Sequence, residues 1–368
     1  MSGREPTTIL KPIIEGQGRG AKLRSKLVAN KEQNWLLALT LNSFAKLAAN
    51  TPLSDLEQII VRTFREKGFN DNDFKQHARL YQQIPDKMRS EIFPEKFARL
   101  NPETKYEYGI KELKADLPSI ERAILAKPNV RDMDVQAIHA KTASVRDYPK
   151  ISQDVLKQYG SATLRAVAPD APTPTALSQQ RYTIKAVSFL CEEETSEWSL
   201  SDEPYWVFGT LGSSKISIAT TSKVFNDTDA GETKTFDGAD GNIWGENGLP
   251  QDFPNGEIGC VIQLWEHDEG DVSKAKAGVE AALNLAKTIV TAVGASALIT
   301  AVITAAGPVI AWLLSFFDDD LISTQNFIFT RQVIEDQLGK TGKSLDVKRR
   351  FTDGDSSYVL TIRVSRVP

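Results

Sequence analysis

The sequence predicts an α+β protein with several domains, in which an all-α N-terminal domain precedes an antiparallel β-sandwich that carries a hydrophobic α-hairpin. Three observations lead to this fold class. Helical periodicity and helix-capping signals fill residues 33–166, whereas short apolar segments bounded by Gly, Pro and Asn follow residue 181. Residues 288–317 form a run of thirty residues without a charge, which predicts helices buried in protein or in lipid.

Composition and charge exclude several classes of protein. The chain has 368 residues, enough for two or three domains, and its net charge of −4 gives no footprint of nucleic-acid binding. No apolar stretch follows the basic residues of the N-terminus, so a secretory signal peptide is not expected. We expect synthesis in the cytoplasm and, for any action outside the cell, a non-classical export route. Cys191 and Cys260 are too few for a disulfide framework.

The N-terminal part divides into an arm and a helical domain. Residues 1–32 are predicted to be a basic, flexible arm, because Gly16, Gly18 and Gly20 oppose regular structure and basic side chains outnumber acidic ones. The helical domain covers residues 33–166, and the segment from Ser54 to Glu57 fits a capping box. Its role is not readable from its sequence. Helices are expected at residues 33–49, 54–67, 71–83, 85–100, 102–114, 118–126, 132–146 and 152–164.

A Pro-rich linker at residues 167–180 separates the helices from the β-domain, because Pro, Ala, Thr and Ser favour an extended chain. The β-domain is predicted to cover residues 181–368. Seven or eight short strands at this spacing are typical of a β-sandwich. The clearest strands are expected at residues 182–191, 204–209, 258–265, 322–329 and 358–364.

The apolar hairpin is predicted at residues 273–317, with its turn at Gly307-Pro308, because proline disfavours helix in the residue before it. A helix of thirty residues is about 45 Å long and a bilayer core needs about 20 apolar residues, so length alone permits membrane insertion. The alternative is a helix pair buried in the core of a soluble protein. The side chains expected to contact lipid are Ile289, Val293, Leu298, Val302, Ile303, Ile310, Trp312, Leu313, Phe316 and Phe317.

Two acidic segments resemble the calcium-binding loops of C2 domains. CEEETSEWSLSDEPYWVF is similar to the first loop of that family, and LWEHDEGD, followed after the hairpin by DDDLI, is similar to the third. The resemblance covers residues 181–368 and places the hairpin inside the third loop. It implies calcium, which prefers oxygen ligands, as a cofactor. The ligands that it implies are Asp202, Glu266, Asp268 and, more loosely, Asp271.

Catalytic residues are not predicted. His267 lies beside Glu266 and Asp268, but no third group that would orient it is identifiable, and Cys260 lies in an apolar strand, where an inert thiol is common. The chain contains neither a G-x-S-x-G nor an H-E-x-x-H motif. The sequence therefore favours a protein that is not an enzyme; a hydrolase with a metal site in the acidic loops is the weakest alternative.

These features together predict a membrane-interacting protein, made soluble, whose hairpin inserts into or docks on a lipid membrane. Permeabilisation by a toxin or effector is the sharpest form of this prediction, and it is similar in outline to colicin-like pore formers. A homo-oligomer is expected for that form, because one hairpin does not line a wide pore. The second hypothesis is a binding or structural protein whose hairpin stays buried against the helical domain while the sandwich binds a protein or a glycan.

Overall fold

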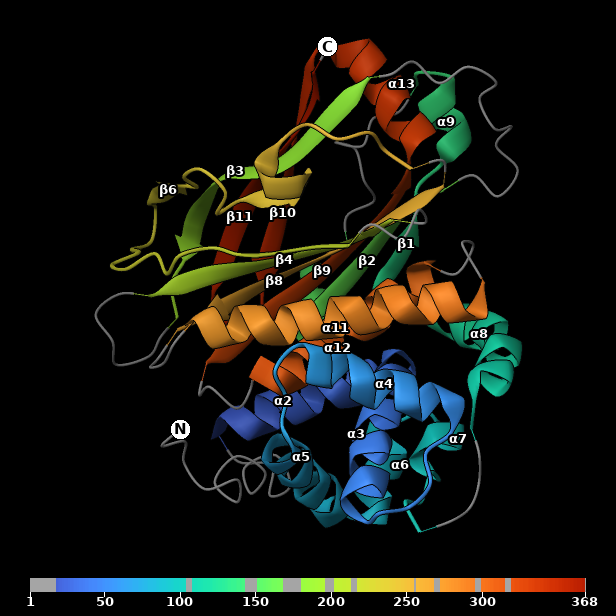
Figure 1. Ribbon diagram of the computed structural model, residues 1–368. Coiled ribbons are helices and arrows are strands. Elements are labelled where there is room, and N and C mark those ends of the chain that lie inside the picture. The colour runs from blue at the N-terminus through green and yellow to red at the C-terminus, as the bar shows by residue number, and fades with distance from the viewer. Residues whose placement is uncertain are drawn as a thin grey trace.

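Helices fill one end of the molecule, two β-sheets fill the other, and a pair of helices lies between them (Figure 1). The computed structural model describes residues 18–103, 108–142, 151–167, 180–195, 202–212, 217–254, 256–267, 272–294, 299–314 and 319–367. The predicted α+β class is confirmed: helices come first along the chain and most strands come later.

The helical end is built from amphipathic helices that bury their apolar faces in one core. Ser54 caps its helix by accepting a hydrogen bond from the backbone N–H of Glu57, so the predicted capping box is confirmed. Helix α8 continues through Pro118, where a boundary was expected, because its buried leucines and isoleucines hold it on the core. The elements are α2 (Gly18–Ala29), η1 (Lys31–Asn34), α3 (Trp35–Ala48), α4 (Asp55–Glu66), α5 (Asp71–Gln83), α6 (Asp86–Ile92), α7 (Glu95–Ala98) and α8 (Ile110–Leu125).

The first sheet has six strands in the order β1-β2-β9-β8-β4-β5. Its strands β9, β8, β4 and β5 pair in antiparallel fashion, whereas β2 is parallel to both β1 and β9. The antiparallel pairing predicted for residues 181–368 holds for the strand pairs described within that range, and the parallel edge comes from β1 and β2, in the segment predicted to be helical. The strands are β1 (Val130–Asp132), β2 (Ser161–Ala166), β4 (Pro204–Gly212), β5 (Ser217–Thr221), β8 (Glu257–Glu266) and β9 (Asp320–Thr330).

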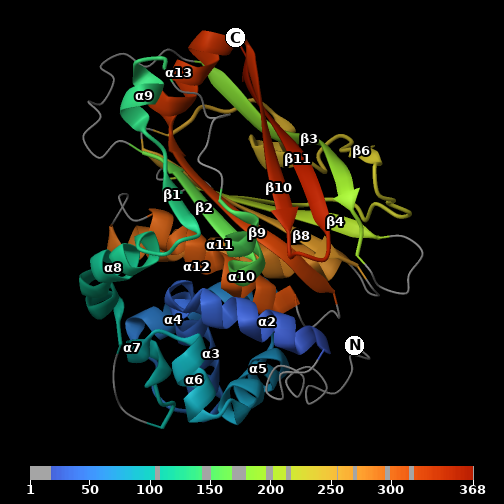
Figure 2. The same ribbon diagram turned by 180° about the vertical axis from the view of Figure 1, so that it is seen from behind.

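The second sheet has the order β10-β11-β3-β6, with β7 also paired to β3, and all of its pairs are antiparallel. Short helices flank the strands, and α9 lies next to α13 in Figure 2. The strands are β3 (Arg181–Glu193), β6 (Thr233–Thr235), β7 (Asn242–Trp244), β10 (Ser344–Thr352) and β11 (Ser357–Val367); the helices are α9 (Val135–His139), α10 (Gln153–Tyr159), η3 (Glu246–Gly248) and α13 (Arg331–Thr341).

Two apolar cores lie on opposite faces of the first sheet. One is shared with the second sheet and contains Trp206 and Ile262 from the first sheet, with Phe351 and Leu360 from the second. The other joins the opposite face to the hairpin and to the helical end. Alternation along each strand produces this division, because successive side chains point to opposite faces.

Several predicted boundaries are wrong. Helix α2 occupies part of the arm predicted to be flexible, and β2 lies where a helix was expected at residues 152–164. Strand β1 and the five-residue helix α9 replace most of the helix expected at residues 132–146. In β2, residues 161–164 are all buried, so the segment shows no two-residue alternation that would reveal a strand. Most of the predicted linker, residues 168–179, lies outside the described residues.

The hairpin is present, but its turn is not where proline suggested. Its helices are α11 (Val272–Val293) and α12 (Ile299–Leu314), so the connection begins at Gly294 and Pro308 lies inside α12. Gly294 has a φ of +67°, a backbone conformation that favours glycine. Gly307 has no Cβ, which relieves one of the clashes between a proline and the residue before it. A buried helix can therefore continue through this position.

Candidate functional site

The apolar hairpin lies between the helical end and the first sheet. Helix α11 contacts β4 and β5 on one side and α4 and α8 on the other, while α12 contacts β8 and β9 as well as α3 and η1. Figures 1 and 2 both show the two helices in this middle layer. Every residue of α12 except Pro308 is buried. The predicted membrane-contacting segment is thus an internal layer of the protein in this conformation.

The side chains predicted to contact lipid are covered on all sides. The least buried of those described is Leu313, which is 5% exposed. Leu298, Phe316 and Phe317 lie outside the described residues. The others that the structure describes are Ile289, Val293, Val302, Ile303, Ile310 and Trp312, all of them buried.

Glycines in the first sheet let the hairpin approach closely. A Cβ on Gly209 would lie 2.7 Å from Cδ1 of Leu283 in α11. A Cβ on Gly259 would lie 2.7 Å from Cγ2 of Ile299 and 3.1 Å from Cβ of Ile303 in α12. We call the surface of the first sheet on which α11 and α12 pack the seat of the hairpin. Real Cβ atoms almost never come within 3.0 Å of another heavy atom, so this seat depends on both glycines.

Polar contacts interrupt this apolar seat. The Gln263 side chain donates to the carbonyl of Gly307 at 3.1 Å from the sheet side. From the helical side, Trp35 donates its indole N–H to the carbonyl of Ala301 at 3.3 Å. Lys67 forms an ion pair of 3.1 Å with Glu280, in which both side chains are about one-third exposed. The hairpin is therefore held by a few specific polar contacts as well as by apolar packing.

His77 forms one of these contacts. The indole N–H of Trp312 lies 3.3 Å from Nδ1 of His77, which is buried beside the ring of Phe44. Burial lowers the pKa of His77 to about 4. At neutral pH the imidazole is uncharged and Nδ1 can accept the indole proton. The sequence alone suggested an ordinary helix residue at this position, because no metal-ligand pattern surrounds it.

Two carboxyl groups, those of Glu257 and Glu121, lie where α8 and the start of α12 meet the first sheet. Burial raises the pKa of Glu257 to about 7, although Arg165 opposes the shift. Burial also raises the pKa of Glu121, against the effects of Arg165 and Thr300. Arg165 has a carboxylate partner in Asp132 at 3.4 Å. Sequence reasoning missed this group, because Glu121, Arg165 and Glu257 come from α8, β2 and β8, which are far apart in the chain.

His267, which precedes α11, and Asp319, which follows α12, form the neck of the hairpin. The carboxylate of Asp319 joins the two sides of this neck. Asp319 accepts a hydrogen bond of 2.8 Å from the hydroxyl of Tyr205, and its other oxygen lies 3.1 Å from Nδ1 of His267. Burial and then the Asp319 carboxylate raise the pKa of Tyr205 well above its usual value. Just outside the neck, Glu266 pairs with Asp320 in the β8–β9 ladder. Both ends of the hairpin are thereby tied to the first sheet.

The predicted calcium ligands do not form a cation site among the described residues. Asp202 is buried and accepts hydrogen bonds from the backbone N–H of Thr195 at 3.0 Å and from the hydroxyl of Tyr358. Glu266 accepts from the backbone N–H of Glu203 at 2.7 Å. Asp268 and Asp271 lie outside the described residues. Within those residues, no three His, Cys, Asp or Glu side chains gather as metal ligands.

Asp202 and Glu266 do lie near each other, as the resemblance to C2 loops implied. Burial first, then Asp202, Cys191 and Glu266, raise the pKa of Tyr358. A neutral phenol therefore donates to Asp202 at the point where a cation was expected. Asp202 acts here as a buried hydrogen-bond acceptor that fixes Thr195 and β11.

Comparison with known proteins gives little guidance. No protein family matches the sequence, and no curated protein matches it. Among solved structures, human GIVD cytosolic phospholipase A2 in complex with methyl gamma-linolenyl fluorophosphonate inhibitor and terbium chloride matches with a TM-score of 0.21 and 9% identity. The same human enzyme with methyl gamma-linolenyl fluorophosphonate matches with a TM-score of 0.22 and 8% identity. Each alignment covers 51% of this chain and 17% of the other.

Both structures are of an enzyme, so the expectation from the sequence that the protein is not an enzyme is not kept. The likeness assigns no activity and no substrate to the present chain, which spans less than a fifth of the phospholipase chain. Among the described residues, no helix combines the length and the apolar character required to cross a membrane.

Proposed function

We propose that the protein contacts a lipid membrane through its α11–α12 hairpin after the hairpin leaves its seat. The pairing of β8 with β9 carries this proposal. The two strands pair with each other as far as Glu266 and Asp320, with one irregularity near Leu264. The hairpin is inserted between the ends of these two strands and takes no part in their pairing. Its departure breaks no strand pairing in the first sheet. The price is the exposure of one apolar core, which a membrane would cover again.

The polar contacts of the seat support release rather than permanent burial. Lys67 and Glu280 form a partly exposed ion pair, which contributes little to stability in water. His77 must be neutral to accept from Trp312, so acid removes that acceptor. These contacts hold the hairpin specifically and respond to pH and salt, which are the conditions that differ at a charged membrane surface.

A disulfide that locks the hairpin to the sheet tests the proposal. In a background with Cys191→Ala, Cys260→Ala and Ile299→Ala, which removes the Cγ2 atom that a Cβ at position 259 would meet, the pair Gly259→Cys/Ile303→Cys places Cβ atoms 3.1 Å apart across the β8–α12 contact. Disulfides span Cβ separations of about 3.5–4.5 Å, so the two Cβ atoms must move slightly apart to form this bridge. The matched control is Gly278→Cys/Leu313→Cys, at 3.5 Å, which joins α11 to α12 and leaves the hairpin free of the sheet.

Both variants are compared with the background protein for binding to phosphatidylcholine–phosphatidylserine vesicles and for dye release, at neutral and acidic pH. We expect the sheet lock to abolish binding until a reductant is added, and the α11–α12 lock to retain it. Equal binding by both oxidised variants would show that the hairpin does not need to leave. Dye release in addition to binding would support permeabilisation, and its dependence on protein concentration would report on oligomerisation.

A binding or structural role with a permanently buried hairpin is the second candidate, and the complete burial of α12 favours it. In that case neither lock changes any vesicle result, because no variant binds vesicles under any condition. The two sheets would then form the sandwich that presents a protein- or glycan-binding surface, and partner capture would follow. Calcium remains a prediction that now rests on Asp268 and Asp271, and calorimetric titration with calcium chloride tests it.

A further inference from the structure

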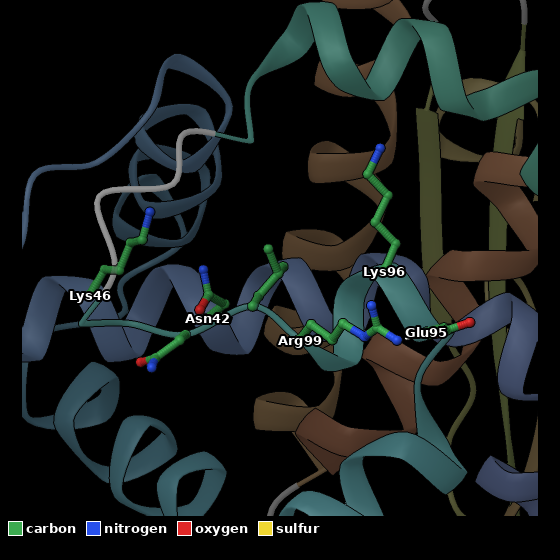
Figure 3. A pocket seen from close by; sticks show the side chains of 7 residues that line it. Asn42, Lys46, Glu95, Lys96 and Arg99 are labelled. Carbon is green, nitrogen blue, oxygen red and sulfur yellow. Dashed lines mark hydrogen bonds and ion pairs between the residues drawn. The ribbon is translucent and has the colours of Figure 1, made fainter.

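The helical end contains a cavity on the side of α3 where α7 crosses it. It is open to solvent and has a volume of about 600 Å³, which is the size of a small-molecule site. Asn42 and Lys46 line it from α3; Glu95 and Lys96 from α7 and Arg99 just beyond line it from the other side. In Figure 3, Lys46 lies at one end, Lys96 and Arg99 lie at the other, and Asn42 lies between them.

The floor of the cavity is a buried carboxylate network. Glu57 accepts from Nζ of Lys46 and from Nδ2 of Asn42, both at 3.0 Å, and from the backbone N–H of Ser54 at 2.8 Å. The side chains of Lys46 and Glu57 are 3% and 1% exposed. Because a carboxylate only accepts hydrogen bonds, the Asn42 amide must direct its NH₂ toward Glu57. Its Oδ1 atom is buried and has no hydrogen-bond partner among the described residues.

The far end of the cavity holds two cations, each paired with a carboxylate. Arg99 pairs with Glu95, and both side chains are 76% exposed. Lys96 pairs with Asp116, with side chains that are 46% and 23% exposed, and lies 5.1 Å from the centre of the Tyr108 ring. An exposed ion pair such as Arg99–Glu95 holds its partners weakly, so an incoming dianion can take over the Arg99 guanidinium. Arg and Lys are the usual donors to phosphate oxygens.

We propose that this cavity binds a phosphate monoester that carries a hydroxyl group. Arg99 and Lys96 hold the phosphate oxygens, and the buried Oδ1 of Asn42 accepts from the hydroxyl. Lys46 stays paired with Glu57 and fixes Asn42 in the orientation that leaves Oδ1 for the ligand. This site is independent of the membrane proposal, because its residues come from α3, from α7 and from the segment just after α7, and none of them lies in the hairpin or in the first sheet.

Isothermal titration calorimetry of the full-length protein at low ionic strength tests this site with glycerol 3-phosphate, inorganic phosphate and glycerol. We expect one site per chain, with glycerol 3-phosphate bound more tightly than phosphate and glycerol not bound. Arg99→Ala and Lys96→Gln should each weaken binding by about tenfold or more, as expected for loss of a charge-assisted hydrogen bond. The matched control, Arg79→Ala on the exposed face of α5, should leave the affinity unchanged.

Asn42→Ala should bring the affinity for glycerol 3-phosphate down to that for inorganic phosphate. In a second experiment, vesicles that contain phosphatidate replace the soluble ester. If binding that depends on Arg99 is seen with the vesicles and not with the soluble probes, the phosphate comes from a lipid headgroup. The proposal is overturned if no phosphate probe binds in either experiment, or if Arg79→Ala weakens binding as much as Arg99→Ala does.

Discussion

The two faces of the first sheet are built differently. The face toward the second sheet is filled by large side chains: Trp206 packs edge-on against Phe351 with ring centres 4.8 Å apart. The face toward the hairpin uses two glycines for close approach, and it buries Gln263 and Thr324 in a hydrogen bond of 3.2 Å. The first interface is a fixed core, whereas the second combines apolar packing with a few polar contacts.

The largest expected difference comes from truncating the fixed core. Trp206 is fully buried and also lies near Phe189 and Phe208. Trp206→Ala should lower the free energy of unfolding by about 3–5 kcal/mol, because it leaves a large cavity between the sheets. Denaturant unfolding followed by circular dichroism measures this loss. A loss below about 1 kcal/mol would mean that the two sheets do not share a fixed core.

The next largest effect is on pH dependence, and it separates two buried groups with opposite signs. The pKa of His77 falls from 6.5 to about 4 on folding, so the unfolded chain binds the proton first and stability falls as pH drops through this window. The pKa of Glu257 rises from 4.5 to about 7, so the folded protein binds the proton first and stability rises as pH drops from about 7 to 4.5. Between pH 4.5 and 6.5 the two contributions oppose each other.

Replacing either group should expose the contribution of the other. Glu257→Gln should lose roughly 3 kcal/mol of stability as the pH falls from 6.5 to 4, and His77→Gln should gain a similar amount as the pH falls from 7 to 4.5. Urea unfolding at a series of pH values measures both slopes. If the two variants share the wild-type slope, neither group titrates differently in the folded and unfolded protein.

A wedge in the seat of the hairpin should have a smaller and local effect. Gly259→Val places side-chain atoms against Ile299 and Ile303, and overpacking of this kind costs about 1–3 kcal/mol. Hydrogen exchange should rise in α11 and α12 and stay low in β10 and β11. The control Gly339→Ala, in α13 where nothing lies within 4 Å, should change neither. Equal loss of protection in all strands would mean that the hairpin and the sheets unfold as one unit.

The smallest expected effect comes from removing the polar character of the seat. Gln263→Met keeps the volume of the side chain but removes its hydrogen bonds to Gly307, Thr324 and Trp265. We expect a loss of stability of about 1 kcal/mol, together with faster vesicle binding because the hairpin loses a hydrogen bond that holds it. Stopped-flow fluorescence measures the binding rate. Slower binding by this variant would show that Gln263 eases the departure of the hairpin instead of holding it.

The calcium prediction shows how far local motifs reach. Two of the predicted calcium ligands, Asp202 and Glu266, accept hydrogen bonds from Thr195, Glu203 and Tyr358. An acidic motif shows which side chains can bind a cation. It does not show which protein groups donate hydrogen bonds to those side chains in the folded structure. Similarly, the proline at 308 signalled a break that burial on every side of α12 overrode.

Local periodicity and the chemistry of neighbouring residues were enough to predict the α+β class, the capping box at Ser54, most of the long strands and an apolar helical hairpin. The packing of the whole chain determines that β2 joins the sheet, that His77 accepts from Trp312, and that the hairpin lies between the helical end and the first sheet. These features depend on residues far apart in the chain, whose contacts are set by how the surfaces pack and not by any pattern along the chain.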